Sequence, residues 1–159
     1  MTSTPPIVIG WREWLALPEL GIPAIKAKID TGARTSSLHV DTLVVDERDS
    51  VTWLHFSVSA TGRKHALPVR CSAPAIARRT VTDSGGHATL RWFIRTRIEL
   101  GGACFETEIN LTNRRNMLFP MLLGRSALGD RFAVDPAASY CCGKPGLKRR
   151  KELNADQHG

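Results

Sequence analysis

Several patterns that define common classes of protein are missing from this chain of 159 residues. No stretch approaches the run of about 20 apolar residues that crosses a bilayer. Residues 1–6 lack the basic start and the apolar run of a signal peptide. We therefore expect a cytoplasmic protein that has no membrane partner. Helical periodicity is scarce, and no internal repeat or low-complexity segment occurs.

Cysteine and histidine patterns exclude further classes. The four cysteines contain no Cys-x-x-Cys spacing, and the adjacent Cys141 and Cys142 could close a disulfide only with strain, so reduced thiols are expected. There is no His-Glu-x-x-His segment, and the five histidines show no ligand pairing, which argues against a bound metal. A Gly-x-x-x-x-Gly-Lys-Ser/Thr loop is also absent. We predict no cofactor, and any dependence on ATP would have to come from a partner.

Acidic residues are outnumbered, which gives a formal net charge of +7. The chain has the length of one domain, which we place at residues 1–142, followed by a basic tail at 143–159. The tail has five Lys or Arg and two acidic residues and no apolar face to pack, so we expect it to be disordered. A basic tail can contact phosphates, but no nucleic-acid-binding motif accompanies it. We expect no specific nucleic-acid partner.

Short runs that suit β-strands dominate the rest of the chain. Aliphatic, β-branched and aromatic residues gather in segments separated by Gly, Pro and Asp. The one helix that we predict is short and follows Gly124, from residue 125 to 128 or 129. Together these patterns predict a mostly antiparallel, all-β domain. The predicted strands are 7–9, 13–17, 24–29, 43–45, 51–58, 78–82, 88–100 and 105–111.

Two motifs carry the chemistry. Asp30-Thr31-Gly32-Ala33 follows an apolar strand, so that a tight Gly turn presents a carboxylate. The motif is weak alone, because Asp and Gly are common in turns. A second segment, Met121-Leu122-Leu123-Gly124-Arg125, brings two apolar residues and a Gly 94 positions after Asp30. The pair is far more specific than either part.

In order and spacing, the two motifs resemble those of retropepsin-like aspartic peptidases. Further strings, Gly10-Trp11-Arg12-Glu13 and Asp83-Ser84-Gly85-Gly86-His87, are similar to the bacterial RimB-type branch, often labelled ATP-dependent zinc proteases. The resemblance covers residues 7 to 140. It implies a single-lobed acid-protease β-barrel in which Asp30, Thr31 and Gly32 form the catalytic turn. Leu122, Leu123, Gly124 and Arg125 would support that turn from behind.

Chemistry of this kind needs two carboxylates that lie about 3 Å apart and share one proton. The chain has one clear half-site, so the resemblance and the chemistry favour a homodimer that contributes Asp30 twice. Asp83-Ser84-Gly85 leaves alternatives open, because it could be a flap or substrate loop, a plain hairpin turn or a second catalytic turn. His87, in the same loop, is either a surface residue or an aid to proton transfer.

Basic residues near these motifs suggest a cleft that attracts acidic peptides. Lys26 and Lys28 alternate on the strand face of Asp30, although each single Lys or Arg could equally be ordinary surface charge. Arg34 stands where viral retropepsins commonly have an acidic residue, which removes an expected partner of Arg125. The residues that we predict to bind substrate are Lys28, Ala33, Arg34, Arg79, Asp83, Gly85, Gly86 and His87.

The resulting hypothesis is an aspartic endopeptidase-like hydrolase, and not a zinc protease by its residues. Its substrate would be an acidic or polyglutamylated tail, because the RimB-type branch is associated with RimK-type ATP-grasp ligases that add glutamate. That ligase is the expected protein partner. The competing hypothesis is a noncatalytic peptide-binding or regulatory module that keeps the fold and acts on the ligase or its product.

Overall fold

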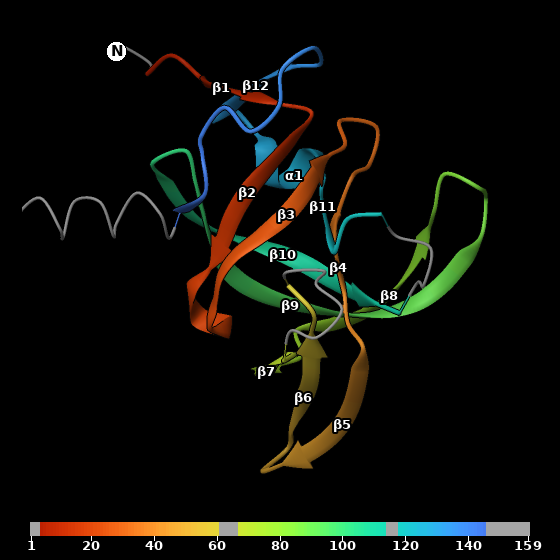
Figure 1. The fold of residues 1–159 in the computed structure, drawn as a ribbon. Coiled ribbons are helices and arrows are strands. Elements are labelled where there is room, and N and C mark those ends of the chain that lie inside the picture. Colours follow the sequence, from red (N-terminus) through yellow and green to blue (C-terminus); the bar gives the residue numbers. More distant parts are fainter. Residues whose placement is uncertain (1–3, 61–66, 114–117, 146–159) are drawn as a thin grey trace, which may run out of the picture.

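The computed structural model describes residues 4–60, 67–113 and 118–145, and these form an almost entirely β structure (Figure 1). One α-helix, α1 (Arg125–Leu128), and one 3-10 turn, Pro18–Leu20, interrupt the strands. The strands are β1 (Ile7–Gly10), β2 (Arg12–Leu17), β3 (Ile22–Ile29), β4 (Ser36–His39), β5 (Thr42–Arg48), β6 (Val51–Val58), β7 (Val69–Pro74), β8 (Ala77–Thr82), β9 (Ala88–Leu100), β10 (Ala103–Thr112), β11 (Met121–Leu123) and β12 (Phe132–Asp135).

Six of these strands close into a barrel. The order in the largest sheet is β10-β4-β11-β3-β2-β9-β8, and β10 also pairs with β9. The ring therefore runs from β10 through β4, β11, β3, β2 and β9 back to β10. Strand β8 lies outside this ring and pairs with the N-terminal part of β9, from Ala88 to Phe93. Closure removes the unpaired edges that an open sheet would expose.

Side-chain alternation explains why these strands enclose one core. In β3, Ile25, Ala27 and Ile29 are buried, while Lys26 and Lys28 between them are exposed. The long strand β9 similarly buries Ile94 and Ile98 and exposes Arg95 and Arg97. The buried side chains of the barrel strands form one cluster with those of β6 and α1. The core therefore fixes the register of the strands that lead into the site.

Two smaller sheets lie outside this ring. The parallel pair β1–β12 joins segments from opposite ends of the described chain. The antiparallel sheet β5-β6-β7 extends away from the barrel, with the turn between β5 and β6 at its far end (Figure 1). Neither sheet contributes a residue to the cleft described below.

The structure confirms the predicted all-β class, and the eight predicted strands are present with their ends shifted by at most a few residues. The helix after Gly124 is also present. Strands β4, β7, β11 and β12 were not predicted. Among the described pairings, seven are antiparallel and three are parallel, in agreement with a mostly antiparallel architecture. Of the predicted tail, residues 146–159 lie outside the described part of the chain.

Candidate active site

The Asp30 turn begins where β3 ends. Asp30 is half-buried, and its side-chain Oδ1 accepts a hydrogen bond from the backbone N–H of Gly32 at 3.0 Å. The N–H of Ala33 donates to the carbonyl of Asp30 at 3.2 Å, which closes the turn. A Cβ at position 32 would lie 3.2 Å from Asp30 Oδ1, closer than most such contacts. The small residue therefore leaves room for the carboxylate to fold back over its own turn.

Strand β11 threads between the two strands that flank this turn. It pairs in parallel with β3, placing Leu123 beside Ile29, and antiparallel with β4, placing Leu122 beside Ser37. The N–H of Asp30 donates to the carbonyl of Leu123 at 2.9 Å. Leu123 is fully buried. A strand from late in the sequence thus holds the backbone of Asp30 directly.

Gly124 makes the closest contact between the two motifs. A Cβ at this position would lie 2.5 Å from the carbonyl oxygen of Thr35, a backbone atom that cannot easily move aside. The N–H of Gly124 donates to Ser36 Oγ at 3.0 Å, and Ser36 is fully buried. Gly124 is therefore required because the backbone behind the Asp30 turn approaches too closely for any side chain.

Arg125 and Ser126 fasten the turn from the other side. Their N–H groups donate to the carbonyls of Ala33 at 2.8 Å and Arg34 at 3.0 Å. The guanidinium Nη1 of Arg125 donates to the carbonyls of Thr31 at 3.1 Å and Gly32 at 3.3 Å. The sequence suggested that Arg125 lacks its expected acidic partner. Its Nη1 donates to these two backbone carbonyls instead.

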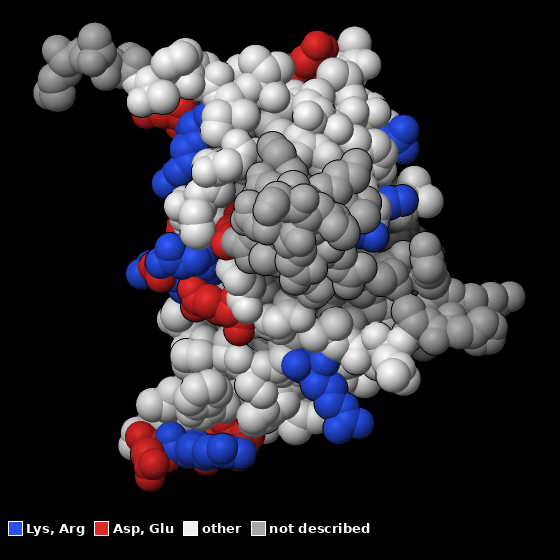
Figure 2. Space-filling model, turned by 60° about the vertical axis from the view of Figure 1, so that its left-hand side comes forward, with Lys and Arg blue, Asp and Glu red and all other residues white. Residues whose placement is uncertain are grey.

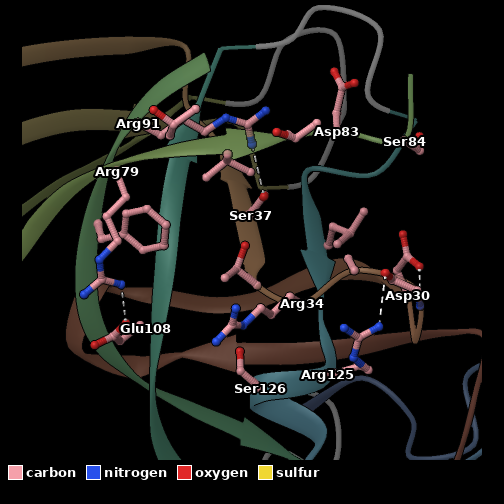
Figure 3. A pocket seen from close by; sticks show the side chains of 18 of the residues that line it. Asp30, Arg34, Ser37, Arg79, Asp83, Ser84, Arg91, Glu108, Arg125 and Ser126 are labelled. Carbon is pink, nitrogen blue, oxygen red and sulfur yellow. Dashed lines mark hydrogen bonds and ion pairs between the residues drawn. The ribbon is translucent and has the colours of Figure 1, made fainter. Parts of the chain in front are cut away.

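A cleft of about 1050 Å³ opens in front of Asp30 (Figure 3). The Asp30 turn and α1 form one side, and the hairpin of β8 and β9 forms another. Figure 3 shows Asp30 beside Arg125, while Arg91 and Ser37 lie together in another part of the cleft. Of the predicted site residues, the lining includes Asp30, Gly32, Ala33, Arg34, Arg79, Asp83, Leu122 and Arg125.

The carboxylate of Asp83 accepts hydrogen bonds from the backbone of its own turn. Its Oδ1 accepts hydrogen bonds from the N–H of Gly85 and the N–H of His87, both at 2.9 Å, and its side chain is only 10% exposed. His87 Nδ1 lies 3.6 Å from the same oxygen, with the imidazole 82% exposed. This geometry is that of an Asp stabilising a hairpin tip. It favours a turn at the end of a cleft wall over a second catalytic turn, because both hydrogen bonds tie the carboxylate to its own hairpin.

The cleft contains both acidic and basic side chains, and the basic ones are arginines. Arg79 donates from Nη1 to Glu108 Oε2 at 3.0 Å, and Arg95 lies 3.4 Å from the other Glu108 oxygen. The hydrogen bond from Arg79 is the largest influence on Glu108 and holds the pKa of its carboxyl below the usual value. Elsewhere, Figure 2 shows basic and acidic side chains interspersed along one side of the molecule.

Several predicted substrate-binding residues do not line the cleft. They are Lys28, Gly85, Gly86 and His87. Thr31 is exposed beside the cleft and contributes its carbonyl to Arg125. The ammonium of Lys26 lies 5.2 Å from the ring of Trp14 and 5.9 Å from the ring of Tyr140, so it packs on aromatic rings outside the cleft. Strand parity placed the two lysines on the face of Asp30, but the chain turns at the end of β3.

Sequence reasoning did not select a polar network beneath the cleft. Arg91, Asn110 and Ser36 are all buried, and hydrogen bonds connect them to the segment behind the Asp30 turn. The available signal was a polar residue between two aliphatic ones, since Asn110 stands between Ile109 and Leu111 in β10. Buried polar groups need partners, so such a residue points to a network.

The described residues contain neither a cluster of metal ligands nor a helix that could cross a membrane. Within 4–60, 67–113 and 118–145, no three His, Cys, Asp or Glu side chains gather as a metal site would require. Over the same residues, the short α1 and the other helical turn fall far below the length and apolarity that a membrane-crossing helix needs.

An Asp on a Gly turn, held from behind by a threading strand inside a closed β-barrel, defines a retropepsin-like aspartic-protease fold. Comparison with known families gives the more specific assignment. The family described as "RimB-like: Retropepsin-like aspartic endopeptidase RimB" matches residues 8–145. This chain belongs to that family, as its motifs suggested.

Similar proteins carry a different kind of name. A "Probable alpha-L-glutamate ligase" from Shewanella pealeana is 40% identical over 139 residues, which are 87% of this chain and 30% of that protein. One with the same name from Desulfotalea psychrophila is 42% identical over 137 residues, 86% of this chain and 30% of its own length. The chain thus spans about 30% of the length of the curated relatives that it matches.

A solved structure shares the fold. It is a Legionella pneumophila protein of unknown function from the group DUF785, with a TM-score of 0.72 and 28% sequence identity. The match covers 86% of this chain and 98% of the Legionella chain. The architecture described above is therefore nearly the whole of that protein.

Proposed function

We propose that this protein is an aspartic-type hydrolase in which Asp30 activates water to cleave an amide bond in an acidic or polyglutamylated peptide. The observation that carries the proposal is the Asp30 turn, which opens on a cleft while β11, Gly124 and Arg125 fix its backbone. Catalytic groups need this kind of rigid support, because small displacements cost large factors in rate.

Hydrolysis requires a second carboxylate, which we assign to Asp30 of a second copy of the chain. One carboxylate would take a proton from water as the oxygen attacks the amide carbon, and the other would donate a proton toward the carbonyl oxygen. Collapse of the tetrahedral species then breaks the C–N bond, and the leaving nitrogen takes a proton. The products are a carboxylic acid and an amine. A two-fold dimer is the simplest assembly that supplies both groups.

The charge of the cleft supports the proposal of an acidic substrate. Its lining contains four arginines and three carboxylates, which are Arg34, Arg79, Arg91, Arg125, Asp30, Asp83 and Glu108. A cleft with excess positive charge attracts acidic peptides. Curated relatives named as glutamate ligases contain this domain as about 30% of their length. A function beside an ATP-grasp ligase, acting on the glutamate tails that such a ligase would make, accounts for both observations.

The second candidate is a noncatalytic module that binds glutamylated peptides for the ligase. The observation that favours it is the name of the relatives, which describes a ligase and no hydrolase. The two candidates differ in whether Asp30 performs chemistry.

Mass spectrometry of a glutamate-tailed peptide separates them. The peptide is incubated with the protein and with Asp30→Asn, from about pH 4 to pH 8, with and without a chelator. Hydrolysis predicts shortened tails with the parent protein alone, regardless of the chelator. Intact tails with both proteins, together with measurable binding, would support the module instead.

A further inference from the structure

The proposed function leaves one motif without a role, Gly10-Trp11-Arg12-Glu13, where β1 leads into β2. Glu13 is fully buried. Its carboxylate accepts hydrogen bonds from the N–H groups of Gly10 at 2.7 Å, Cys141 at 2.9 Å and Cys142 at 3.1 Å. A buried carboxylate with three N–H donors is well satisfied and its hydrogen bonds are strong. The motif therefore clamps a segment from the far end of the described chain onto the start of β2.

The clamped segment holds Tyr140 in an unusual backbone conformation. Its φ is 53°, a left-handed value that residues other than glycine seldom adopt and that costs free energy. The N–H of Tyr140 donates to the carbonyl of Arg12 at 2.9 Å. In the same segment, the carbonyl of Ala138 lies so close to Gly10 that a Cβ there would collide with it. Close packing and hydrogen bonds thus fix the position of Tyr140 against its own backbone preference.

The ring of Tyr140 belongs to a layer of aromatic rings and cations on the outer face of β2 and β3. The guanidinium of Arg12 lies 4.9 Å from the centre of this ring. The ammonium groups of Lys26 and Lys144 lie 5.2 Å and 4.7 Å from the ring of Trp14. All three distances are within the range of cation–π contacts. The rings carry no net charge, so they hold these cations without neutralising them.

Four positive side chains gather on this outer face, and we call them the cationic face. They are Arg12, Lys26, Lys28 and Lys144. Exposed arginines on other strands pair with carboxylates. These pairs are Arg48–Asp46, Arg79–Glu108, Arg95–Glu108 and Arg97–Glu19. Within residues 4–60, 67–113 and 118–145, no carboxylate forms an ion pair with the cationic face. Its positive potential therefore adds up, whereas carboxylates offset the charge of those arginines.

The cationic face continues into the cleft. In the strand register, Arg12 of β2 lies beside Lys28 of β3, and Lys28 lies beside Leu122 of β11. Paired residues project from the same side of a sheet, so these three side chains form a row. Leu122 lines the cleft, and Figure 1 shows β2, β3 and β11 side by side. A peptide that leaves the cleft over Leu122 therefore meets Lys28 and then Arg12.

The geometry of this face suits an extended acidic peptide. Lys26 and Lys28 are both exposed and stand at alternate positions of β3. Alternate residues of a strand are about 6.8 Å apart, which is also the repeat of alternate side chains in an extended peptide. Single-stranded nucleic acid is another polyanion, but it binds by stacking its bases on aromatic rings. Here the protein's own cations lie over the rings of Trp14 and Tyr140, which favours the peptide.

We infer that the cationic face binds a glutamate-rich stretch of the peptide substrate outside the cleft, while the amide bond to be cleaved lies at Asp30. This inference rests on the proposed function, to which it adds a second binding surface and a preference for long acidic tails over short ones. Each exposed ion pair is weak alone. Several pairs made by one chain that is already held in the cleft add up, because the effective concentration of the second segment is high.

The test starts with binding of a twelve-glutamate peptide, measured by calorimetry with Asp30→Asn protein so that no cleavage occurs. The face variant adds Lys26→Gln and Lys28→Gln to this background. The matched control adds Arg48→Gln and Arg70→Gln, which remove the same charge from β5 and β7, two strands that do not line the cleft. A twelve-nucleotide uridine RNA is the probe for nucleic acid. Circular dichroism and thermal unfolding check the fold of each variant.

The face variant should weaken peptide binding by about 10-fold at about 50 mM salt, because each exposed ion pair contributes a few-fold. The loss should shrink as salt rises, since salt screens exposed charges. The control should weaken binding by less than about 2-fold. Equal losses in the two variants would overturn the inference. It would also be overturned if the RNA bound more tightly than the peptide and the face variant abolished that binding, because the face would then serve nucleic acid.

Cleavage kinetics separate this inference from the proposed function. In protein that retains Asp30, the face variant should raise KM for the twelve-glutamate peptide by about 10-fold and keep kcat within about 2-fold, because the Asp30 turn is unchanged. A four-glutamate peptide extends only about 14 Å, too short to occupy both surfaces, so its KM should rise by less than about 3-fold. An unchanged KM for the long peptide would overturn the inference alone. Peptide binding through the cationic face without cleavage by the parent protein would overturn the hydrolase proposal alone.

Discussion

The two Asp-x-Gly turns of this protein are almost identical locally and very different in their surroundings. Asp30 Oδ1 accepts the N–H of Gly32 at 3.0 Å, and Asp83 Oδ1 accepts the N–H of Gly85 at 2.9 Å. Behind the first turn lies a threading strand and a buried serine. At the second turn, Asp83 Oδ1 also accepts the N–H of His87, so both of these hydrogen bonds stay within one hairpin.

This difference indicates that a tight Asp turn becomes a candidate active site when distant segments of the chain pack behind it and hold its backbone. The Asp30 turn is fixed by hydrogen bonds from segments more than 85 positions away, including that of Gly124 to Ser36. Short-range contacts of the Asp83 turn can form in any hairpin. The same kind of substitution made in each of the two turns should therefore have unequal effects on cleavage and on stability.

The largest difference is expected for the carboxylates themselves. Asp30→Asn should lower peptide cleavage by at least about 1000-fold, because an amide cannot act as a base. Asp83→Asn should lower cleavage by about 10-fold or less, through a looser hairpin at the cleft wall. Initial rates on a glutamate-tailed peptide measure both effects. Equal losses would contradict the separation of roles between the two turns.

Glycine substitutions test the packing behind each turn. Gly124→Ala places a methyl group where the carbonyl of Thr35 lies, 2.5 Å away, and should lower the free energy of unfolding by about 2 to 3 kcal/mol. Gly85→Ala meets only side chains of its own loop, His87 at 3.2 Å and Asp83 at 3.3 Å, and should cost less than about 1 kcal/mol. Urea unfolding of both variants provides the comparison. A smaller loss for Gly124→Ala than for Gly85→Ala would show that the backbone behind Asp30 is not tightly packed.

Serine hydroxyls give a smaller contrast. Ser36→Ala leaves the buried N–H of Gly124 without its acceptor and should lower the free energy of unfolding by about 1 to 2 kcal/mol. Ser84, the middle residue of the second turn, is exposed, so Ser84→Ala should change stability by less than about 0.5 kcal/mol. Thermal unfolding of each variant resolves the two values, and a larger effect at Ser84 would contradict the comparison.

The smallest effect should come from the ion pair that joins the hairpin wall to the barrel. Arg79 of β8 holds the pKa of Glu108 in β10 below its usual value, so ionised Glu108 stabilises the fold at neutral pH. This contribution is present above the unfolded-state pKa and is lost as pH falls through the lower, folded-state pKa. Because Glu108 is 35% exposed and Arg79 is 53% exposed, the contribution should stay below about 1 kcal/mol.

Unfolding of the parent and of Glu108→Gln from about pH 3 to pH 7 measures this contribution. The difference in the free energy of unfolding should shrink toward zero at the acid end. A difference that grows with acidity would reverse the sign of the argument. Cleavage by Glu108→Gln would further show whether the hairpin wall must be fixed for activity.

Local patterns predicted most of the fold. Runs of aliphatic, β-branched and aromatic residues bounded by Gly, Pro or Asp placed β3, β6 and β9 correctly, because such side chains favour strands. Strand β4 was not predicted, since Ser36 and Ser37 are polar residues that are nonetheless buried. Their burial depends on partners from β9, β10 and the segment after β11, which no local pattern contains.

Part of the candidate site followed from the sequence as well. The spacing of the Asp30 and Gly124 motifs led to the resemblance that the family assignment confirmed. Lys28 and His87 were predicted to bind substrate and lie outside the lining of the cleft, because strand parity and sequence proximity do not describe how a chain turns. The burial of Arg91 in β9 could not be predicted, because it depends on partners from another strand, such as Asn110 in β10.

By itself, the sequence determined the all-β class, most strands and the two motifs, because strand propensity and turn chemistry act over a few residues. Only the tertiary structure decided which of two similar Asp turns opens on a cleft with support behind it, and which arginine is buried in its wall. The physical reason is that both outcomes depend on hydrogen bonds between distant segments. Gly124 to Ser36 and Arg91 to Asn110 are such bonds, and each exists only when the barrel has closed.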